Sequence, residues 1–436
     1  MSGKGNGGGM ELSSSHVQKG FYYGWVITGL AGLMYMVKAG ILTYGAGPMN
    51  EALVREFGWS NTEIGLAFSL GGLFFWLTPI VGVVTVKYGP RLILGGSGLL
   101  VSLALFATAF ISEPWHFVLS QGIAIAIISQ FTVMLPMYAI INNWWLTKRG
   151  TNAGLVNGLG GLGGLIFVPI LAWLLVTYGW KVSLIVMSIV VLLFATLPQW
   201  FLFRNHPSEK GQEIDNGVVP NKKENEKTNT NLYISPIDWT VKDAIRTPQI
   251  WVVMLIFGAV TATFIASTYY GFLHLRNMGV SVLVASSIQG SLGVFTAISS
   301  ILTGFLIDRL GARKLIIAAC LLNGIGIILL IFSSTPIIAW VYAIVFGLAT
   351  GIMLPCVTTI IASYYGAKNY AAIQGSAQWI LSICASLTPL IAGIIADATG
   401  SFQSVFIFSG ALCFIALIFA IMLKPPTPKF IHEGEV

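Results

Sequence analysis

The residue of this sequence with the clearest capacity for chemistry is Lys38, which lies inside the apolar stretch from Gly24 to Met49. That stretch is long and apolar enough to cross a membrane, and the lysine lies several turns from its nearest polar flank. A charge at that depth is costly, and intramembrane charges mark functional sites by default. An anion leaving water needs a compensating charge and hydrogen bonds. Lys38 is therefore a candidate anchor for an anionic substrate.

Residues three and four positions from Lys38 share its face of a helix. Tyr35 is the polar residue among them, so we expect it beside the ammonium group. The alternative is that Lys38 snorkels toward the outer interface along Ile41 and Leu42. Hydroxyls in membrane helices often bond only to backbone or to a neighbouring helix. Polar residues at similar depth on other segments complete the candidate substrate site: Gln130, Thr132, Tyr269, Tyr270, Ser300, Thr350 and Gln378.

The composition predicts a membrane protein that crosses the bilayer many times. Hydrophobic residues make up 56% of the 436 residues and charged residues 9%, against roughly a quarter charged in a soluble protein. The net charge of +7 does not indicate nucleic-acid binding, because the basic residues are spread over short loops and a polar linker. The cysteines lack metal-ligand or CxxC spacing. We expect no metal, no cofactor and no enzymatic activity.

Twelve segments have the length of a membrane span, which predicts an all-α membrane protein with two six-helix, pseudo-symmetric halves. A polar stretch divides them into six and six, with a short amphipathic helix expected at 235–245. The predicted spans are 22–46, 61–85, 92–112, 116–141, 151–177, 182–203, 249–273, 281–306, 314–334, 336–363, 370–396 and 402–423. The predicted regions are a disordered tail (1–21), the N-terminal half (22–203), a linker (204–248), the C-terminal half (249–423) and a second tail (424–436).

The distribution of lysine and arginine predicts that both termini and the linker are cytoplasmic. With this orientation the outer side holds only Arg55, Lys181 and Arg276, while the remaining loop cations are cytoplasmic. We expect a plasma membrane location, the inner membrane in a bacterium, and a monomer surrounded by lipid. At the outer end of the seventh span, His274 and Arg276 are candidates for attracting anions to the mouth of the pathway.

An internal repeat relates the two halves. The loops GVVTVKYGPR (82–91) and GFLIDRLGAR (304–313) share glycine, a basic residue, glycine and arginine in the same register. Two parallel six-helix halves are the architecture of alternating-access transporters, whose substrate site lies between the halves near the midplane. The candidate cytoplasmic gate comprises Lys87, Arg91, Asp308, Arg309 and Arg313.

At these loops the chain resembles the major facilitator superfamily, whose signature there is GxLxDRxGxR. The second copy keeps Asp308, Arg309 and Arg313, whereas Val86 stands in the first copy where the family has aspartate. The resemblance implies that these charges latch the cytoplasmic side when the transporter faces outward. The alternative is that Lys87 and Arg91 serve only as positive-inside anchors.

A narrower resemblance, to the branch with monocarboxylate transporters and oxalate:formate antiporters, implies secondary transport of small organic anions. It rests on YYGW (22–25), REFGWSNTEIGLAFSL (55–70), NNWWLTKRGTNAGLVNGLGGLGG (142–164), GLATGIMLP (347–355) and PLIAGIIADATGSF (389–402). This chain departs from the branch in its anion clamp. Ser300 stands near the usual arginine of span eight, Gln378 lies in span eleven where the antiporters add a lysine, and Thr350 replaces an aromatic in span ten. We expect Lys38 to take over the anchoring role.

The mode of coupling is inferred from missing carboxylates, since no aspartate or glutamate lies in the middle of a predicted span. A fixed cation favours exchange of monoanions, with a counter-anion as partner. The alternative is proton-coupled uptake, in which Lys38 loses its proton for the empty return. Two other classes stay open: a carrier of a neutral or zwitterionic solute, and a membrane sensor that no longer transports.

Overall fold

The computed structural model describes residues 21–132, 134–146, 148–217, 233, 235, 237–366 and 369–426. The predicted N-terminal tail as far as residue 20, residues 218–232, 234 and 236 of the predicted linker, and the C-terminal tail beyond residue 426 lie outside the described residues. Within the described ranges the chain forms helices and connecting loops, with no strand. The prediction of an all-α protein is confirmed.

Ten helices among the described residues are long and apolar enough to cross a membrane. The longest, Arg149–Leu202, is broken at Gly179, whose φ of 80° reverses the chain, so it supplies two crossings. A further helix of crossing length runs from Asn61 to Tyr88. Among the described residues these helices give the twelve predicted crossings, six before and six after the polar stretch of the sequence.

The helices of the N-terminal half include several local changes of helical pitch. Its segments are α1 (Gly24–Lys38), η1 (Ala39–Tyr44), α2 (Ala46–Phe57), α3 (Asn61–Leu73), η2 (Phe74–Leu77), α4 (Thr78–Tyr88), α5 (Pro90–Thr108), α6 (Pro114–Phe117), η3 (Val118–Ile125), α7 (Ala126–Gln130), α8 (Met134–Trp144), α9 (Arg149–Val190), η4 (Val191–Thr196) and α10 (Leu197–Leu202). Two short turns follow, η5 (Pro207–Lys210) and η6 (Ile214–Gly217).

The C-terminal half is built from longer unbroken helices. Its segments are α11 (Val241–Arg246), α12 (Pro248–Asn277), α13 (Val282–Leu310), α14 (Ala312–Ile331), α15 (Pro336–Tyr365), α16 (Tyr370–Thr399) and α17 (Phe402–Met422). The short helix predicted at 235–245 is α11, which begins later than expected because the Thr240 side chain caps it by accepting from the Asp243 amide.

The first transmembrane helix is longer than predicted. It continues past residue 46 as α2 and ends at Phe57, where Gly58 adopts a φ of 68° and stops the helix. The extension carries Asn50, Glu51 and Arg55, so its apolar pattern is interrupted and its length is not evident from hydropathy. As a result Lys38 lies near the middle of the continuous helix Gly24–Phe57.

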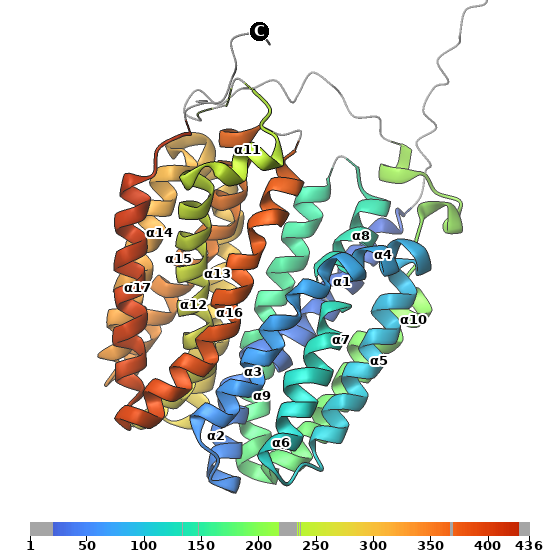
Figure 1. The fold of residues 1–436 in the computed structure, drawn as a ribbon. Helices are drawn as coiled ribbons and strands as arrows, with labels where there is room; N and C mark the ends of the chain where they lie inside the picture. Colours follow the sequence, from blue (N-terminus) through green and yellow to red (C-terminus); the bar gives the residue numbers. More distant parts are fainter. Residues whose placement is uncertain are drawn as a thin grey trace, which may run out of the picture.

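The two halves stand side by side, with α3 against α16 and α9 against α13 (Figure 1). One end of the bundle, called the basic end, carries Lys87, Arg91, Arg309 and Arg313 at the α4–α5 and α13–α14 turns. The opposite end carries Glu51 of α2 and Arg276 of the last turn of α12.

Glycines allow α9 and α13 to touch backbone to backbone. A Cβ atom added at Gly161 would lie 2.2 Å from the carbonyl oxygen of Gly293, and one at Gly164 would lie 2.5 Å from that of Gly290. Small residues at such crossings permit close approach of membrane helices. This seam joins the halves through their middle.

We expect Gly161→Ala to lower the thermal unfolding temperature of the purified protein, because the methyl group meets fixed backbone at 2.2 Å and overpacking costs about 1–3 kcal/mol. Gly154→Ala on the same helix is the matched control, since nothing lies within 4 Å of its added Cβ. Equal unfolding temperatures for the two variants would contradict the close α9–α13 contact.

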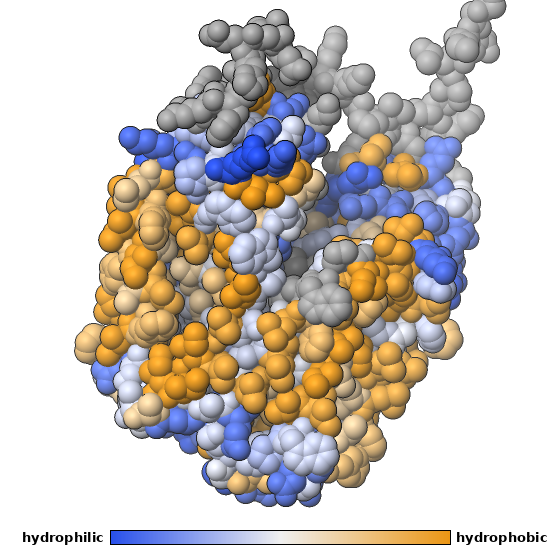
Figure 2. Space-filling view, in the orientation of Figure 1, coloured by the Kyte–Doolittle hydropathy of each residue, from blue (hydrophilic) through white to orange (hydrophobic). Residues whose placement is uncertain are grey.

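The halves are also joined at the opposite end, by polar contacts between α3 and α16. The carboxylate of Asp397 accepts from the amides of Asn61 and Thr62 at 3.1 and 2.8 Å, and from their side chains at 2.8 and 2.6 Å. Nearby, the Arg276 Nε lies 3.4 Å from a Glu51 carboxylate oxygen. Toward the basic end the molecular surface is hollowed between the halves (Figure 2).

Candidate substrate site between the halves

A cavity of about 430 Å³ lies between the two halves. Five transmembrane helices line it: the first, second and fourth of the N-terminal half, together with α12 and α16. Its hydrogen-bonding side chains are neutral: Thr43, Gln121, Ser129, Gln130, Thr261, Tyr269, Gln378 and Ser382. The aromatic and aliphatic lining includes Leu42, Phe68, Ile125, Phe264, Ile265 and Leu381. Apolar walls with a few convergent polar groups are typical of a small-molecule site.

Three of the predicted substrate residues line this cavity. Gln130 comes from α7, Tyr269 from α12 and Gln378 from α16. The Tyr269 ring stacks on Phe68 of α3, with ring centroids 4.3 Å apart and an angle of 23° between the planes. The stack crosses from one half to the other, so movement of the halves relative to each other would change the cavity wall.

Lys38 is not among the lining residues of this cavity; it is buried inside the protein and is 2% exposed. Among the described residues, the Lys38 Nζ has no hydrogen-bond partner. Leu42, one helical turn further along, lines the cavity. The ammonium group does not extend along Ile41 and Leu42 to the surface, which is what snorkelling would require. A buried amine without a partner is costly, so its retention favours a role in binding.

Lys38 is the last residue before a π-helical segment, η1. Two more π-helical segments, η3 and η4, occur in the fourth and sixth transmembrane helices of the same half. Single π-helical turns inside α-helices are frequent at functional sites, because they shift the side chains that follow. Leu42 and Thr43 of η1, and Gln121 and Ile125 of η3, are lining residues of the cavity.

Gln121 is a site residue that the sequence analysis missed. It lines the cavity, and its Oε1 is buried without a hydrogen-bond partner. An amide in the apolar segment 116–141 is a signal of function, but its orientation depends on the η3 segment, which the apolar pattern does not predict. Thr43 of η1, Ser129 of α7 and Ser382 of α16 also line the cavity and were not predicted.

The structure does not bring the other five predicted polar residues to the cavity lining. The Tyr35 ring packs against Gly160 of α9, and the Ser300 backbone lies against Gly351 of α15. Three hydroxyls bond to backbone: Thr132 to Ile128 at 2.6 Å, Tyr270 to Pro389 at 2.8 Å and Thr350 to Phe346 at 2.8 Å. Tyr270 thereby joins α12 to α16.

The two residues predicted at the outer mouth have different surroundings. His274 is 3% exposed inside the C-terminal half, with its Nε2 3.0 Å from the Leu330 carbonyl oxygen and its ring against Phe406. The structure thus places His274 away from the mouth. Arg276 lies at the opposite end, paired with Glu51 of the other half, and donates to the Val280 carbonyl at 2.8 Å.

The predicted gate residues lie at the basic end of the bundle. The Nη2 of Arg91 donates to the Trp200 carbonyl at 2.7 Å, and that of Arg313 donates to the Ile421 carbonyl at 2.6 Å. The Lys87 Nζ lies 5.2 Å from the ring centroid of Tyr88, and Arg309 lies in the last turn of α13. The side chain of Asp308 lies outside the described part of the structure.

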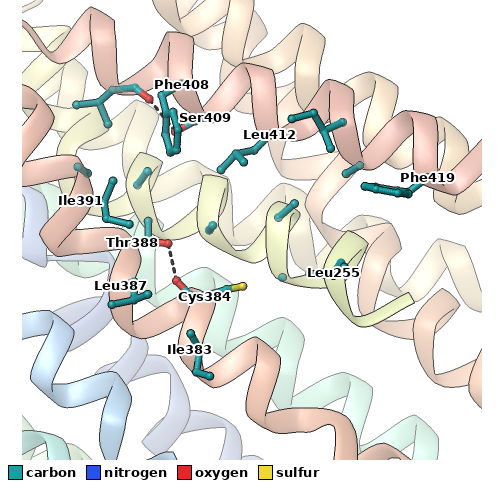
Figure 3. Close-up of a pocket in the computed structure, with 18 residues that line it drawn as sticks. Leu255, Ile383, Cys384, Leu387, Thr388, Ile391, Phe408, Ser409, Leu412 and Phe419 are labelled. Atoms are coloured by element: carbon teal, nitrogen blue, oxygen red, sulfur yellow. Dashed lines mark hydrogen bonds between the residues drawn. The ribbon is translucent and has the colours of Figure 1, made fainter. Parts of the chain in front are cut away.

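A second cavity, of about 340 Å³, lies on the outside of the C-terminal half between α12, α16 and α17 (Figure 3). Leu255, Leu387 and Phe408 line it and remain exposed on the surface. Its hydroxyls bond to their own helices, Thr388 to Cys384 at 2.6 Å and Ser409 to Val405 at 2.8 Å. No charged residue lines it, so it lacks the chemistry to select a polar substrate.

Comparison with known proteins identifies the family. The sequence model of the major facilitator superfamily matches residues 24–295 and 255–435. The chain belongs to the major facilitator superfamily. The resemblance expected from the loop motifs is confirmed, and this superfamily member is a multi-pass membrane protein with a transporter fold.

Curated relatives of this superfamily member are named as transporters of sugar acids and of monocarboxylates. The probable L-galactonate transporter of Escherichia coli (strain K12) is 25% identical, with 85% of this chain and 84% of the relative aligned. The hexuronate transporter of Bacillus subtilis (strain 168) is 24% identical, with 84% and 87% aligned. Monocarboxylate transporter 13 of Rattus norvegicus is 20% identical, with 77% and 73% aligned.

Solved structures share the superfamily fold. A bacterial homologue of the human lysosomal transporter Spinster, in an inward-facing and occupied conformation, superposes with a TM-score of 0.70. The sequences are 14% identical, and the match covers 95% of this chain and 98% of that one. This likeness concerns the fold and not the substrate.

Proposed function

We propose that this protein is a secondary transporter of a small organic monoanion that works by alternating access in the plasma membrane. The observation that carries the proposal is the cavity between the halves, with its neutral hydrogen-bonding lining and the buried, unpartnered Lys38 one turn from Leu42. A carboxylate entering this region supplies the charge and the acceptors that the ammonium lacks.

The lining favours a carboxylate that also carries hydroxyl groups. One cation balances one negative charge, so a monoanion fits better than a dianion. The amides of Gln121, Gln130 and Gln378 both donate and accept hydrogen bonds, as sugar hydroxyls do. The names of the relatives include hydroxylated acids, L-galactonate and hexuronate, beside monocarboxylates.

The structure corresponds in this proposal to the state open to the cytoplasm. The positive-inside rule assigns the basic end to the cytoplasm. The surface is hollowed at that end, while the α3–α16 contacts join the halves at the opposite end (Figure 2). Breaking the α3–α16 hydrogen bonds would let the halves separate at the opposite end and open the outer side.

The change between the inward-open and outward-open states is costly when the site is empty, because the ammonium charge of Lys38 stays buried and unbalanced. A bound monoanion neutralises that charge. This favours exchange of anions, or uptake in which Lys38 loses its proton before the empty return. Counterflow in proteoliposomes without a pH gradient tests the exchange mode. Labelled anion should enter liposomes preloaded with the same unlabelled anion, and uptake that requires ΔpH would contradict exchange.

The same assay separates the competing functions through two variants. Lys38→Gln should lose counterflow of anions, whereas Lys181→Gln, which changes an exposed lysine, should retain it. A carrier of neutral or zwitterionic solutes would keep its activity in Lys38→Gln. A membrane sensor would show no counterflow in the unmodified protein.

We expect Gln130→Leu to weaken transport of hydroxylated acids more than that of acids without hydroxyls. The leucine cannot bond to a buried hydroxyl, and an unsatisfied buried group costs about 1–3 kcal/mol. At 1.4 kcal/mol per factor of ten, we expect roughly tenfold weaker competition by a sugar acid in uptake assays. Propionate, a carboxylate without a hydroxyl group, serves as the internal control. An equal loss for both acids would contradict hydroxyl recognition by Gln130.

A further inference from the structure

A third cavity, of about 310 Å³, lies at the basic end of the C-terminal half. It surrounds the α13–α14 turn and is closed by residues from α15 and from the segment after α17. Its cations are Arg313 and Lys314, and Ser363 and Tyr364 supply polar side chains to its wall. It is separate from the cavity between the halves, since the two share no lining residue.

The charges around this third cavity are not balanced by the described residues. Arg313 and Lys314 lie in the first turn of α14, which contains no acidic residue. A helix N-terminus carries partial positive charge, so cations there are unfavourable and anions favourable. Among the described side chains, no carboxylate lies within 4.0 Å of either cation. The Arg313 Nε is buried and has no hydrogen-bond partner in the described part of the chain.

The internal repeat provides a comparison for this site. Arg91 is the counterpart of Arg313, and its Nε and Nη2 both donate to the Trp200 carbonyl, at 3.2 and 2.7 Å. The Asn205 side chain lies against the turn at Gly89 and accepts from the Arg91 amide at 2.9 Å. In the C-terminal copy, Arg313 donates through Nη2 to Ile421, its Nε is unpartnered, and a cavity lies beside the turn.

We propose that this third cavity binds the phosphate of an anionic phospholipid. The guanidinium of Arg313 and the ammonium of Lys314 supply the charge-assisted donors that a phosphate oxygen prefers. The site lies where α13, α14 and α15 begin or end, which is the level of lipid headgroups. Leu310 and Ile317 extend its wall with apolar side chains, and Leu310 is 47% exposed, so an acyl chain can continue along the helices. Basic pockets between transmembrane helices are recognised sites for anionic headgroups.

Thermal unfolding of the full-length protein in mixed detergent–lipid micelles tests this proposal. Palmitoyl-oleoyl phosphatidylglycerol should raise the unfolding temperature relative to palmitoyl-oleoyl phosphatidylcholine. In Arg313→Gln and in Lys314→Gln, the phosphatidylglycerol concentration needed for half of that rise should increase about fivefold for each charge removed. Two variants are used so that a folding defect in one does not decide the outcome.

Arg91→Gln is the matched control, because it removes the same charge at the same end of the molecule from the repeat-related position. It should keep the response to phosphatidylglycerol. An equal loss of the response in Arg91→Gln would show general surface attraction and overturn the site. Inorganic phosphate is the second arm. If phosphate without lipid reproduces the stabilisation, the ligand is a soluble anion and the lipid assignment is wrong.

Discussion

Lys38→Met is expected to abolish anion transport and at the same time to raise the thermal stability of the empty protein. The side chain is 2% exposed and its Nζ has no hydrogen-bond partner, so the ammonium stabilises nothing in the structure without substrate. Replacing buried ionic groups by packed apolar ones can stabilise proteins by about 1–4 kcal/mol. Methionine has a similar length and no charge, so we expect the unfolding temperature to rise by several degrees.

The loss of transport in Lys38→Met should be large. Truncating one partner of a buried charge pair costs about 2–5 kcal/mol, which corresponds to a loss of about 30-fold or more at 1.4 kcal/mol per factor of ten. The checks are the unfolding temperature of the purified variant and its counterflow activity. A variant that is less stable and inactive would indicate a structural role for Lys38, and one that transports anions normally would exclude the anchor.

Asp397→Ala is expected to shift the protein from the state described here toward one that is open at the opposite end. The Asp397 carboxylate accepts four hydrogen bonds from Asn61 and Thr62, including the first two amides of α3. The next amide, that of Glu63, is capped by the Ser60 side chain within the same half. Losing a helix-capping acceptor costs about 0.5–2 kcal/mol. We therefore expect a change of about 2-fold to 30-fold in the ratio of the two states.

Spin labels at Glu56→Cys and Gln403→Cys, in a background without the native cysteines, measure this shift as a distribution of distances across the opposite end. Glu51→Gln is the matched control. It removes the Glu51–Arg276 ion pair, whose side chains are each 30% exposed, and such pairs contribute about 0–1 kcal/mol. The longer distance should gain population in Asp397→Ala and little in Glu51→Gln. Equal distributions in both variants would contradict a latch centred on Asp397.

The fold could be predicted from the sequence because each crossing is a long apolar segment and the loops carry the basic residues. The extension Ala46–Phe57 could not, since Asn50, Glu51 and Arg55 interrupt its apolar pattern although the helix continues to Gly58. The tight reversal at Gly179 depends on one backbone conformation, with a φ of 80°, rather than on a polar loop.

The candidate site was predictable in part. Gln130, Tyr269 and Gln378 line the cavity because polar groups in apolar spans tend to face the interior of the bundle. The rotation of each helix could not be predicted, and η1 and η3 change it locally. Gln121 was therefore missed, and Thr350 was included although its hydroxyl bonds to Phe346 in its own helix. His274 was expected at a polar mouth, but a carbonyl group and an aromatic ring surround it.

The recognition of an anion by Lys38 is tested most directly by ligand-induced stabilisation of purified protein, measured side by side for wild type and Lys38→Gln. The ligands are a sugar acid such as galactonate, the corresponding neutral alditol, and lactate. We expect a carboxylate to raise the unfolding temperature of the wild type, with little effect of the alditol and no effect of the acid on Lys38→Gln. Equal stabilisation of both proteins by the acid, or stabilisation of the wild type by the alditol alone, would contradict the anchor and favour a carrier of neutral solutes.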